Sequence, residues 1–580
     1  MTINVVRLLL VAALSVVLVD PQVALAQGPA KEPTAIGRDG GAATVDAYGT
    51  RAAVRALRHG GNAVDAAVAA AAVLGVTEPY SCGIGGGGFM VIRTADGKVT
   101  TIDSREESPA AMRPGSFFVN GAPPDPADDD DFDSARYSGL SAGVPGTVAG
   151  WDRALRDYGS WSLRRALRGG VHRARRGFVV DETFASQTEP NVPWLDDIPS
   201  TAEIYLDPDG TPRDVGSRLR NPDLARTYRL IGTEGLQGFY GGDLAEATAD
   251  AARRPPVAPG ADHEWRPGLL TESDLQAYEA LEREPTHVGY RGLDVWSMGP
   301  PSSGGSTVGE ALNILEGYPD LAADRTRALH LFLEASRFSY ADRSAYIADP
   351  EFFDVPLSGL LSDSYAAERR ALIDPEQAAT SPVAAGDPRP YSSTTHIVTS
   401  DREGTVVSYT FTIESTGGNA IVVPGYGFLL NNELTDFNID STTHPNRPDG
   451  QKRPRSSMAP TIVTKHGRPF LAVGSPGGST IITTVLQMLL ERLDLGATLP
   501  EAIAAPRASQ RNRATTEAEQ AFIDSPEGQA LASSYGHVFE VPDSEEIGAA
   551  TGLELGRHGR VLAAAEPERR GGGSAAVVRP

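Results

Sequence analysis

The first hundred residues change from a helical to an extended pattern of hydrophobic positions. Residues 50–58 have helical spacing, and Asn62 is a suitable N-cap for a second helix over residues 63–74. This second segment is apolar nearly all round, which predicts a buried helix. Alternation then predicts strands over residues 89–93 and 99–103.

The remaining pattern predicts helices first and strands afterwards. Several helices are expected between residues 144 and 254, and a long amphipathic helix over residues 329–347. From residue 394 the period shortens to two, so segments 394–399 and 406–413 are expected to form a hairpin. Later strands are expected over 421–423, 427–430, 461–463 and 470–474, and a helix over 480–493. This mixture predicts stacked layers of sheet and helix.

The N-terminus has the features of an export signal. Arg7 precedes an apolar run over residues 8–19, and Ala24-Leu25-Ala26 is a small-x-small cleavage site. The run is too short to span a membrane comfortably. We therefore expect a signal peptide over residues 1–26, no membrane span in the mature chain, and a periplasmic, cell-envelope or extracellular location. An uncleaved anchor is the alternative.

Composition and charge restrict the partners. The 580 residues are 40% apolar and 22% charged, with a net charge of −23, which is ordinary for a globular protein. A negative surface repels nucleic acid and anionic membranes, so neither is expected as a partner. The single cysteine, Cys82, excludes an intramolecular disulfide and suggests a buried structural thiol.

Two familiar motifs occur in the wrong context. Residues 83–88 fit the dinucleotide pattern Gly-x-Gly-x-x-Gly, but a helix is expected before them and a strand after them, the reverse of what nucleotide binding needs. Residues 139–143 fit the Gly-x-Ser-x-Gly elbow around Ser141, but a polar segment replaces the buried strand that should precede it. A serine hydrolase using Ser141 remains a weaker alternative.

The acidic run over residues 128–131 lies within a Pro- and Asp-rich stretch, 122–134, that is expected to be a surface loop. Its spacing lacks the alternating aspartates and the glycine of a calcium loop. A solvated charge run is the better interpretation, and we predict no metal site.

Thr394 lies where a stretch poor in structure, residues 378–393, gives way to the predicted hairpin. A threonine hydroxyl is a weak nucleophile within a chain. If the bond between Ser393 and Thr394 is cut, the new α-amino group, which titrates near pH ~8, can serve as its base. The hypothesis is a precursor that cuts itself at this bond and uses Thr394 for acyl transfer.

Three further places carry groups suited to such chemistry. Gly477-Gly478 lies between a predicted strand and a helix, where backbone N–H groups can form an oxyanion hole. Ser456-Ser457 follows a basic stretch, and Arg105 follows a strand; both could hold a carboxylate. Each signal alone is weak, because an ordinary turn or a surface ion pair explains it equally well.

Ten blocks spread over almost the whole chain together resemble the γ-glutamyltransferase (γ-glutamyl transpeptidase, glutathione hydrolase) family. They are GGNAVDAAVAAAAVLGVTEP (60–79), GIGGGGFMVI (83–92), IDSREESP (102–109), AGVPGTVAGW (142–151), GPPSSGG (299–305), EASRFSYADRSAYIADPEF (334–352), TTHIVTSDREGTVVSYTFTI (394–413), LLNNELTDF (429–437), RPRSSMAPTIV (453–463) and GSPGGSTIITTVLQ (474–487). The resemblance implies an α+β N-terminal-nucleophile hydrolase with a four-layer αββα sandwich. It also implies self-cleavage into a large subunit (27–393) and a small subunit (394–580) that together form one core.

The resemblance further implies the residues of the site. Thr394 is expected to be the nucleophile, with Thr412 bonded to its hydroxyl and amino terminus. Gly477 and Gly478 are expected to form the oxyanion hole. Arg105, Ser456 and Ser457 are expected to bind the α-carboxylate of the substrate. Glu433 and Asp436 are expected to bind its α-ammonium group, with Glu414 nearby. Glutathione and other γ-glutamyl compounds are the expected donors, with water, amino acids or peptides as acceptors, and no cofactor is needed.

Three positions depart from the family's usual pattern. Glu414 stands where many members have asparagine, Thr480 replaces a common arginine, and the segment 438–455 is shorter than in members with a lid. These departures bear on the preferred substrate. The alternatives are a glutaryl or cephalosporin acylase of the same fold, which does not need the α-ammonium pocket, and a non-catalytic binding protein.

Overall fold

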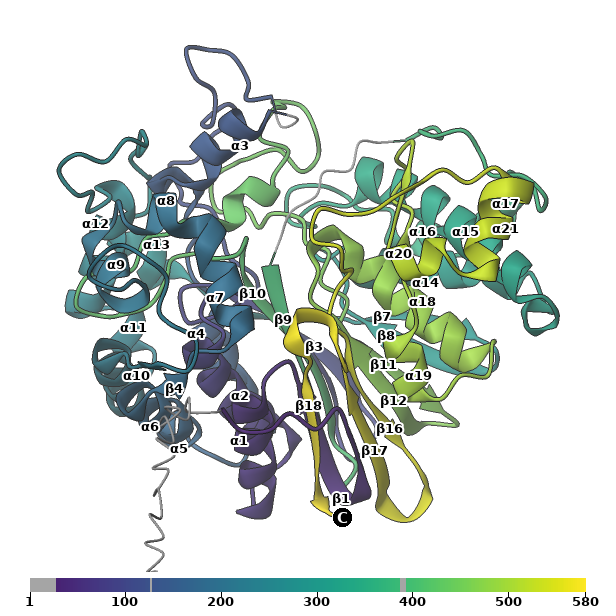
Figure 1. Cartoon of the computed structure of the whole chain (residues 1–580), viewed down its shortest axis with the longest axis horizontal. Coiled ribbons are helices and arrows are strands. Elements are labelled where there is room, and N and C mark those ends of the chain that lie inside the picture. Colours follow the sequence, from purple (N-terminus) through teal and green to yellow (C-terminus); the bar gives the residue numbers. More distant parts are fainter. Residues whose placement is uncertain (1–27, 126–127, 386–392) are drawn as a thin grey trace, which may run out of the picture.

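The computed structural model describes residues 28–125, 128–385 and 393–580. Figure 1 shows a central body of strands with one group of helices on each side. The proposed signal peptide lies outside the described residues.

Thirteen strands of the described chain form one continuous sheet. Its order is β6 (Leu281–Arg283), β3 (Val99–Ser104), β2 (Gly87–Arg93), β10 (Val406–Glu414), β9 (Ser393–Asp401), β1 (Thr34–Thr44), β17 (Arg560–Ala565), β16 (Thr551–Leu555), β12 (Arg468–Gly474), β11 (Thr461–Lys465), β8 (Leu293–Ser297) and β7 (Thr286–Tyr290), with β18 (Ser574–Arg579) also paired to β1. The hairpin β9–β10 is therefore an interior part of the sheet.

The sheet folds back on itself, so its two halves form two layers. Strand β12 packs against β9 and β10, and β11 packs against β2, although none of these pairs is hydrogen-bonded as neighbours. Successive residues of β9 pack into different apolar clusters, with Ile397 in one and Val398 in the other. This alternation follows from the period of two along a strand.

Helices cover the outer face of each layer (Figure 1). On one side α1 (Ala47–Arg58) packs on α2 (Ala63–Thr77), and α2 packs on β9 and β10. On the other side α14 (Gly304–Glu316) packs on β7 and β8, beside α15 (Arg325–Tyr346) and α18 (Ile481–Leu493). The layers are thus helix, sheet, sheet and helix, which confirms the predicted αββα sandwich.

Most predicted elements occur, with shifted ends. Helix α2 is buried along its whole length and begins at an Asn62 capping box, as expected. The hairpin, the strands near residues 461 and 470, and the long helix near residue 329 also form. The acidic run predicted as loop instead begins helix α3 (Asp129–Arg136), capped by the Asp128 side chain.

The prediction of strands over residues 421–423 and 427–430 was wrong, because these segments form only a single β-bridge, between Val422 and Leu429. Two side chains of helix α9 (Pro199–Tyr205) form hydrogen bonds with the backbone of Val422 instead. Ser200 Oγ donates to Val422 O at 2.8 Å, and Val422 N–H donates to Thr201 Oγ1 at 2.9 Å. With both groups of Val422 satisfied, no ladder is required there.

The two motifs judged to be in the wrong context remain so. Residues 83–88 follow a helix and lead into β2. Ser141 lies in a 3₁₀ turn, and its hydroxyl donates to the carbonyls of Arg136 (2.7 Å) and Ser138 (2.9 Å). Cys82 is buried as a free thiol. Among the described helices, none combines the length and apolarity needed to cross a membrane.

Candidate active site

Thr394 and Thr412 lie opposite one another in the register of β9 and β10. Thr394 Oγ1 donates a hydrogen bond to Thr412 Oγ1 over 3.5 Å. Thr412 Oγ1 also accepts from the Glu414 N–H at 2.8 Å. Both threonines are buried. The contact is long for a hydrogen bond between two hydroxyls, and it turns the Thr394 hydroxyl toward Thr412.

Arg570, which the sequence did not single out, holds the backbone of the same residue. Its Nη1 donates to Thr394 O at 3.0 Å, and its Nη2 donates to Ser81 Oγ at 2.8 Å. Because 176 positions separate Arg570 from Thr394, no local pattern could have revealed the contact. The Gly571–Gly573 run beside it was the only signal.

The predicted oxyanion turn joins β12 to α18. Gly477 has φ +132° and Gly478 has φ +57°, conformations that favour glycine. The Gly477 carbonyl accepts two hydrogen bonds within the turn, from Thr480 N–H at 3.0 Å and from Thr480 Oγ1 at 2.7 Å. The turn is therefore held rigidly next to the sheet.

His396 on β9 connects this strand to β12, the strand that leads into the turn. Its ring is buried against Gly474, where an added Cβ would lie only 2.2 Å from a ring carbon. His396 Nδ1 is 2.8 Å from Thr410 Oγ1. Burial lowers the pKa of His396 to about 3, so the ring is neutral and packs as an uncharged group.

Three further predicted residues, Arg105, Glu433 and Asp436, also come together, beside Glu106, which was not predicted; these four residues are the Arg105 cluster. The Arg105 guanidinium contacts the carboxylates of Glu433 and Asp436, and Glu106 lies 3.8 Å away. Its remaining donors reach the carbonyls of Pro454 (3.1 Å) and Arg455 (3.0 Å). Arg105 itself is fully buried.

Burial controls the charge of this cluster. Removal from water raises the pKa of Glu433 to about 7, although Arg105 beside it acts in the opposite direction. Burial and the neighbouring Glu433 carboxylate also raise the pKa of Glu106. The carboxyl groups thus outnumber the single guanidinium, and a bound cation would relieve their repulsion.

Glu414 extends the cluster toward Thr412. Its carboxylate accepts hydrogen bonds from Ser415 Oγ and Asn432 Nδ2. Burial, followed by the charges of Asp436 and Glu433, raises its pKa. Glu414 also has φ +78°, a strained conformation for a non-glycine residue. The bulge between Thr412 and Glu414 in the ladder accounts for this backbone.

Ser456 and Ser457 follow Arg455, whose carbonyl binds Arg105. Ser456 Oγ accepts from the Met458 N–H at 3.1 Å. Ser457 Oγ accepts from Arg343 Nη2 at 2.7 Å, so Arg343 is a second residue near the site that sequence reasoning missed. Arg343 lies on α15, within one of the quoted blocks.

An open cleft of about 820 Å³ passes the end of the hairpin. Ser415, Gly477 and Arg570 all line it, which places the oxyanion turn and the arginine that binds Thr394 on one cleft. Arg511 and Arg513 also line it. The volume suits a ligand of small-peptide size.

The chain is similar to known proteins over most of its length. The family model described as Gamma-glutamyltranspeptidase matches residues 49–577. The chain belongs to this family. It is 36% identical over 552 residues to the glutathione hydrolase proenzyme of Escherichia coli (strain K12), covering 91% of this chain and 90% of the relative. It is 38% identical over 531 residues to the glutathione hydrolase proenzyme of Bacillus subtilis (strain 168), covering 86% of each.

Among solved structures, a cephalosporin acylase from Bacillus halodurans matches with a TM-score of 0.81 and 28% identity. The match covers 97% of this chain and 99% of that one. The fold is therefore that of the γ-glutamyltranspeptidases and their acylase relatives. Membership alone does not decide between a γ-glutamyl donor and another acyl donor.

The three departures from the usual family pattern have identifiable partners. Glu414 joins the carboxyl groups near Arg105, and Thr480 braces the Gly477 carbonyl. In the short segment 438–455, Asn446 Nδ2 donates to Asp436 O and its Oδ1 accepts from Arg455 N–H, both at 2.8 Å. This segment thus ties together the two backbone stretches that flank Arg105.

Proposed function

We propose that this family member is a self-processing γ-glutamyltransferase with glutathione hydrolase activity. The observation that carries the proposal is the Thr394–Thr412 contact of 3.5 Å at the start of β9, with the oxyanion turn and Arg570 on the same cleft. A hydroxyl held in this way is ready both to cut its own chain and, afterwards, to attack a substrate.

In the first step, Thr394 Oγ attacks the carbonyl carbon of Ser393. The C–N bond breaks, its nitrogen becomes the α-amino group of Thr394, and water hydrolyses the resulting ester. The products are a large subunit ending at Ser393 and a small subunit beginning at Thr394. Both remain in one core, because β9 pairs with β1 of the large part.

In the second step, the new α-amino group accepts the Thr394 hydroxyl proton as Oγ attacks the γ-glutamyl carbonyl. The N–H groups of Gly477 and Gly478 stabilise the oxyanion, a contribution of about 3–4 kcal/mol for one donor in a comparable site. The amine leaves with the proton. Water or an amino-acid or peptide acceptor then takes the γ-glutamyl group from Thr394.

The Arg105 cluster supports a γ-glutamyl rather than a glutaryl donor. A substrate α-carboxylate can pair with Arg105, Ser456 and Ser457, while its α-ammonium can pair with the carboxyl groups of Glu414, Glu433 and Asp436. A glutaryl group has a carboxylate that would compete for Arg105, but it has no ammonium. It would therefore bring no cation to the buried carboxyl groups of Glu414 and Glu433. The charges of the Arg105 cluster therefore favour the transferase over an acylase of the same fold.

The test compares γ-glutamyl-p-nitroanilide with glutaryl-p-nitroanilide on the purified, matured protein. The proposal predicts a much larger kcat/KM for the γ-glutamyl donor, and loss of that preference in Glu433→Gln. Equal rates, or a preference for the glutaryl donor, would instead support the acylase. The proposed location is outside the cytoplasm, after removal of residues 1–26.

A further inference from the structure

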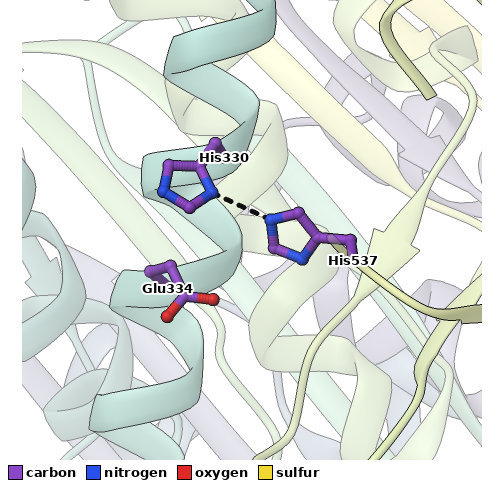
Figure 2. Close-up of side chains that lie close together, drawn as sticks. All are labelled: His330, Glu334 and His537. Carbon is purple, nitrogen blue, oxygen red and sulfur yellow. Dashed lines mark hydrogen bonds between the residues drawn. The ribbon is translucent and has the colours of Figure 1, made fainter. Parts of the chain in front are cut away.

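A group of buried side chains of the kind that bind metals is separate from the active-site residues described above (Figure 2). His330, Glu334 and His537 bring their ligand atoms within 4.8 Å of one another. Glu334 Oε1 is already paired with the buried Arg337 guanidinium at 3.0 Å. A divalent ion would therefore lie beside an arginine with a single carboxylate to balance both, which is unfavourable in a buried place. An ion held by His537 Nε2 would also leave Nδ1 of that ring, which is buried, without a partner among the described residues. The charges thus disfavour a metal site here.

The surface carries a different feature, an arginine-rich face on a chain that is acidic overall. The 580 residues include 75 aspartates and glutamates. None of these acidic residues falls within 47–64, 158–180 or 215–222. The same three stretches hold eleven arginines, which we call the arginine face. Positive charge is therefore concentrated in a small part of an acidic protein.

The arginines of this face follow two helices. In α1, Arg51, Arg55 and Arg58 recur every third or fourth residue, and in α6 (Arg168–Arg176) Arg168 and Arg175 lie two turns apart. All five side chains are exposed. Both helices pack on the buried helix α2, so these stripes lie on the sides of the helices that face away from it.

Contacts between the elements join the arginines into one face. Figure 1 shows α1, α6 and α5 (Leu163–Ala166) close together. Arg173 of α6 lies over the Tyr48 ring of α1, 3.8 Å from its centroid. Arg165 Nη2 donates to His59 O, directly after α1, at 2.9 Å. Partial removal from water, followed by the charges of arginines on α6 and α1, lowers the pKa of His172. The cations are thus close enough to act on a common group.

The charge of the arginine face is not neutralised by the protein. Within the described residues, none of its eleven arginines pairs with a carboxylate. By contrast, Arg156 on α4 (Thr147–Tyr158) and Arg253 on α12 (Gly242–Arg253) pair with Asp157 and Asp250, at 3.0 and 2.7 Å. The hydrogen bonds that arginines of the face donate go to backbone carbonyls, which carry no compensating charge.

Net charge predicted that anionic membranes are repelled, but net charge does not describe this face. At physiological salt, charges more than about 10 Å away are largely screened. Of the acidic residues that border the arginine stretches, Asp46 and Asp65 are buried, and Asp181 pairs with Lys31. A surface that approaches the face therefore meets mainly cations.

We propose that the arginine face docks the protein on a membrane surface rich in anionic phospholipid. A plane of lipid phosphates is complementary to cations that are spread over several helices. Docking of this kind is peripheral and needs no membrane-spanning helix. None of the eleven arginines lines the active-site cleft, so docking need not cover it. At the location proposed above, outside the cytoplasm, lipid rather than nucleic acid is the anionic surface at hand.

The experiment measures binding of the purified protein to sedimented phosphatidylcholine vesicles, with and without about 30% phosphatidylglycerol. We expect binding to the anionic vesicles only, with an affinity that falls more than tenfold between about 0.05 and about 0.5 M NaCl. The combined variant Arg55→Gln, Arg175→Gln and Arg176→Gln should bind about 100-fold more weakly, since each arginine strengthens such binding roughly fivefold. All three side chains are exposed, so the unfolding temperature and kcat/KM for a soluble donor should not change.

The matched control is the combined variant Arg156→Gln, Arg253→Gln and Arg254→Gln, which removes as many charges from arginines that are paired with aspartates. It should bind the vesicles like the wild type. An equal loss in this control would show that net charge drives binding, and would overturn the proposal. Wild-type protein that ignores anionic vesicles, a face variant that binds like the wild type, equal binding to neutral vesicles, or binding to duplex DNA alone would each overturn it as well.

Discussion

The Arg105 guanidinium contacts the Glu433 carboxylate in a place where neither side chain reaches solvent. The two residues are 328 positions apart in the chain. The guanidinium and the carboxylate therefore neutralise each other in this structure. Under the proposed function, a bound γ-glutamyl group would exchange this contact for two new ones, which would make donor binding sensitive to the protonation of Glu433.

The first prediction is a pH dependence of donor preference. Glu433 has a pKa of about 7 because it is buried, and it attracts an α-ammonium only when ionised. The ratio of kcat/KM for γ-glutamyl-p-nitroanilide to that for glutaryl-p-nitroanilide should rise with pH through about 7 and then level off. Both donors would react with the same Thr394 hydroxyl and amine, so the pH dependence of these groups cancels in the ratio. The remaining pH dependence reports the ionisation of Glu433.

Glu433→Gln is the control for this dependence, since it keeps the shape of the side chain and removes its charge. The ratio should then be low and flat between pH 5.5 and 8.5. A wild-type ratio that does not change with pH would show that Glu433 does not bind the ammonium.

The second prediction concerns stability. Burial raises the pKa of Glu414 above its unfolded value of about 4.3. The protonated form is thus favoured in the folded state, and its contribution to stability is complete below that value and lost as pH rises through the raised pKa. In a Thr394→Ala background, which remains one chain, Glu414→Gln should raise the unfolding temperature at pH 8 by about 2 °C and change it less at pH 5.

Glu403→Gln is the matched control, because Glu403 lies in the turn of the same hairpin with its side chain half exposed. It should not alter the difference between pH 5 and pH 8. If Glu414→Gln behaves like Glu403→Gln, burial of Glu414 has no energetic effect.

The third prediction separates two neighbouring threonines. Thr412→Val removes the hydroxyl that faces Thr394, so the nucleophile loses its orienting partner, and kcat should fall about 100-fold with little change in KM. Thr395→Val is the control: Thr395 is also buried, and its Oγ1 has no hydrogen-bond partner within the described residues. Initial rates on matured protein measure both. A larger loss in Thr395→Val would move the chemistry from Thr394 to Thr395.

The fourth prediction tests the oxyanion turn. A Cβ on Gly477 would lie 2.7 Å from Thr480 Oγ1, and the backbone has φ +132°. Gly477→Ala must therefore shift the turn, and kcat should drop by about 10²–10³ because the Gly477 N–H would no longer point at the oxyanion. Gly404→Ala is the control, because its φ of +93° is also positive while nothing lies within 4 Å of the added Cβ. Equal losses in both would indicate a general effect of strain.

Local patterns predicted the elements that surround the site, but not those that depend on distant partners. The hairpin β9–β10 was predicted, because Tyr409, Phe411 and Ile413 alternate with polar residues in β10. Strand β1, with the sequence TAIGRDGGAAT, was missed because its glycines have low strand propensity. It is a strand because β9, β17 and β18 all pair with it.

The site residues, like the strands, could be predicted from local motifs but not where they depend on distant partners. Thr394, Arg105 and Glu433 could be proposed because the motifs around them resemble a known family. Arg570 and Arg343 could not, since each acts through a carbonyl or hydroxyl more than a hundred positions away.

The most direct test of the account is the N-terminal sequence of the smaller fragment from the matured wild-type protein, beside Thr394→Ala treated identically. The account predicts a fragment that begins Thr-Thr-His-Ile-Val, starting at Thr394, and a single undivided chain for Thr394→Ala. An undivided wild-type chain with full activity, a fragment starting at Thr395, or normal division of Thr394→Ala would contradict it.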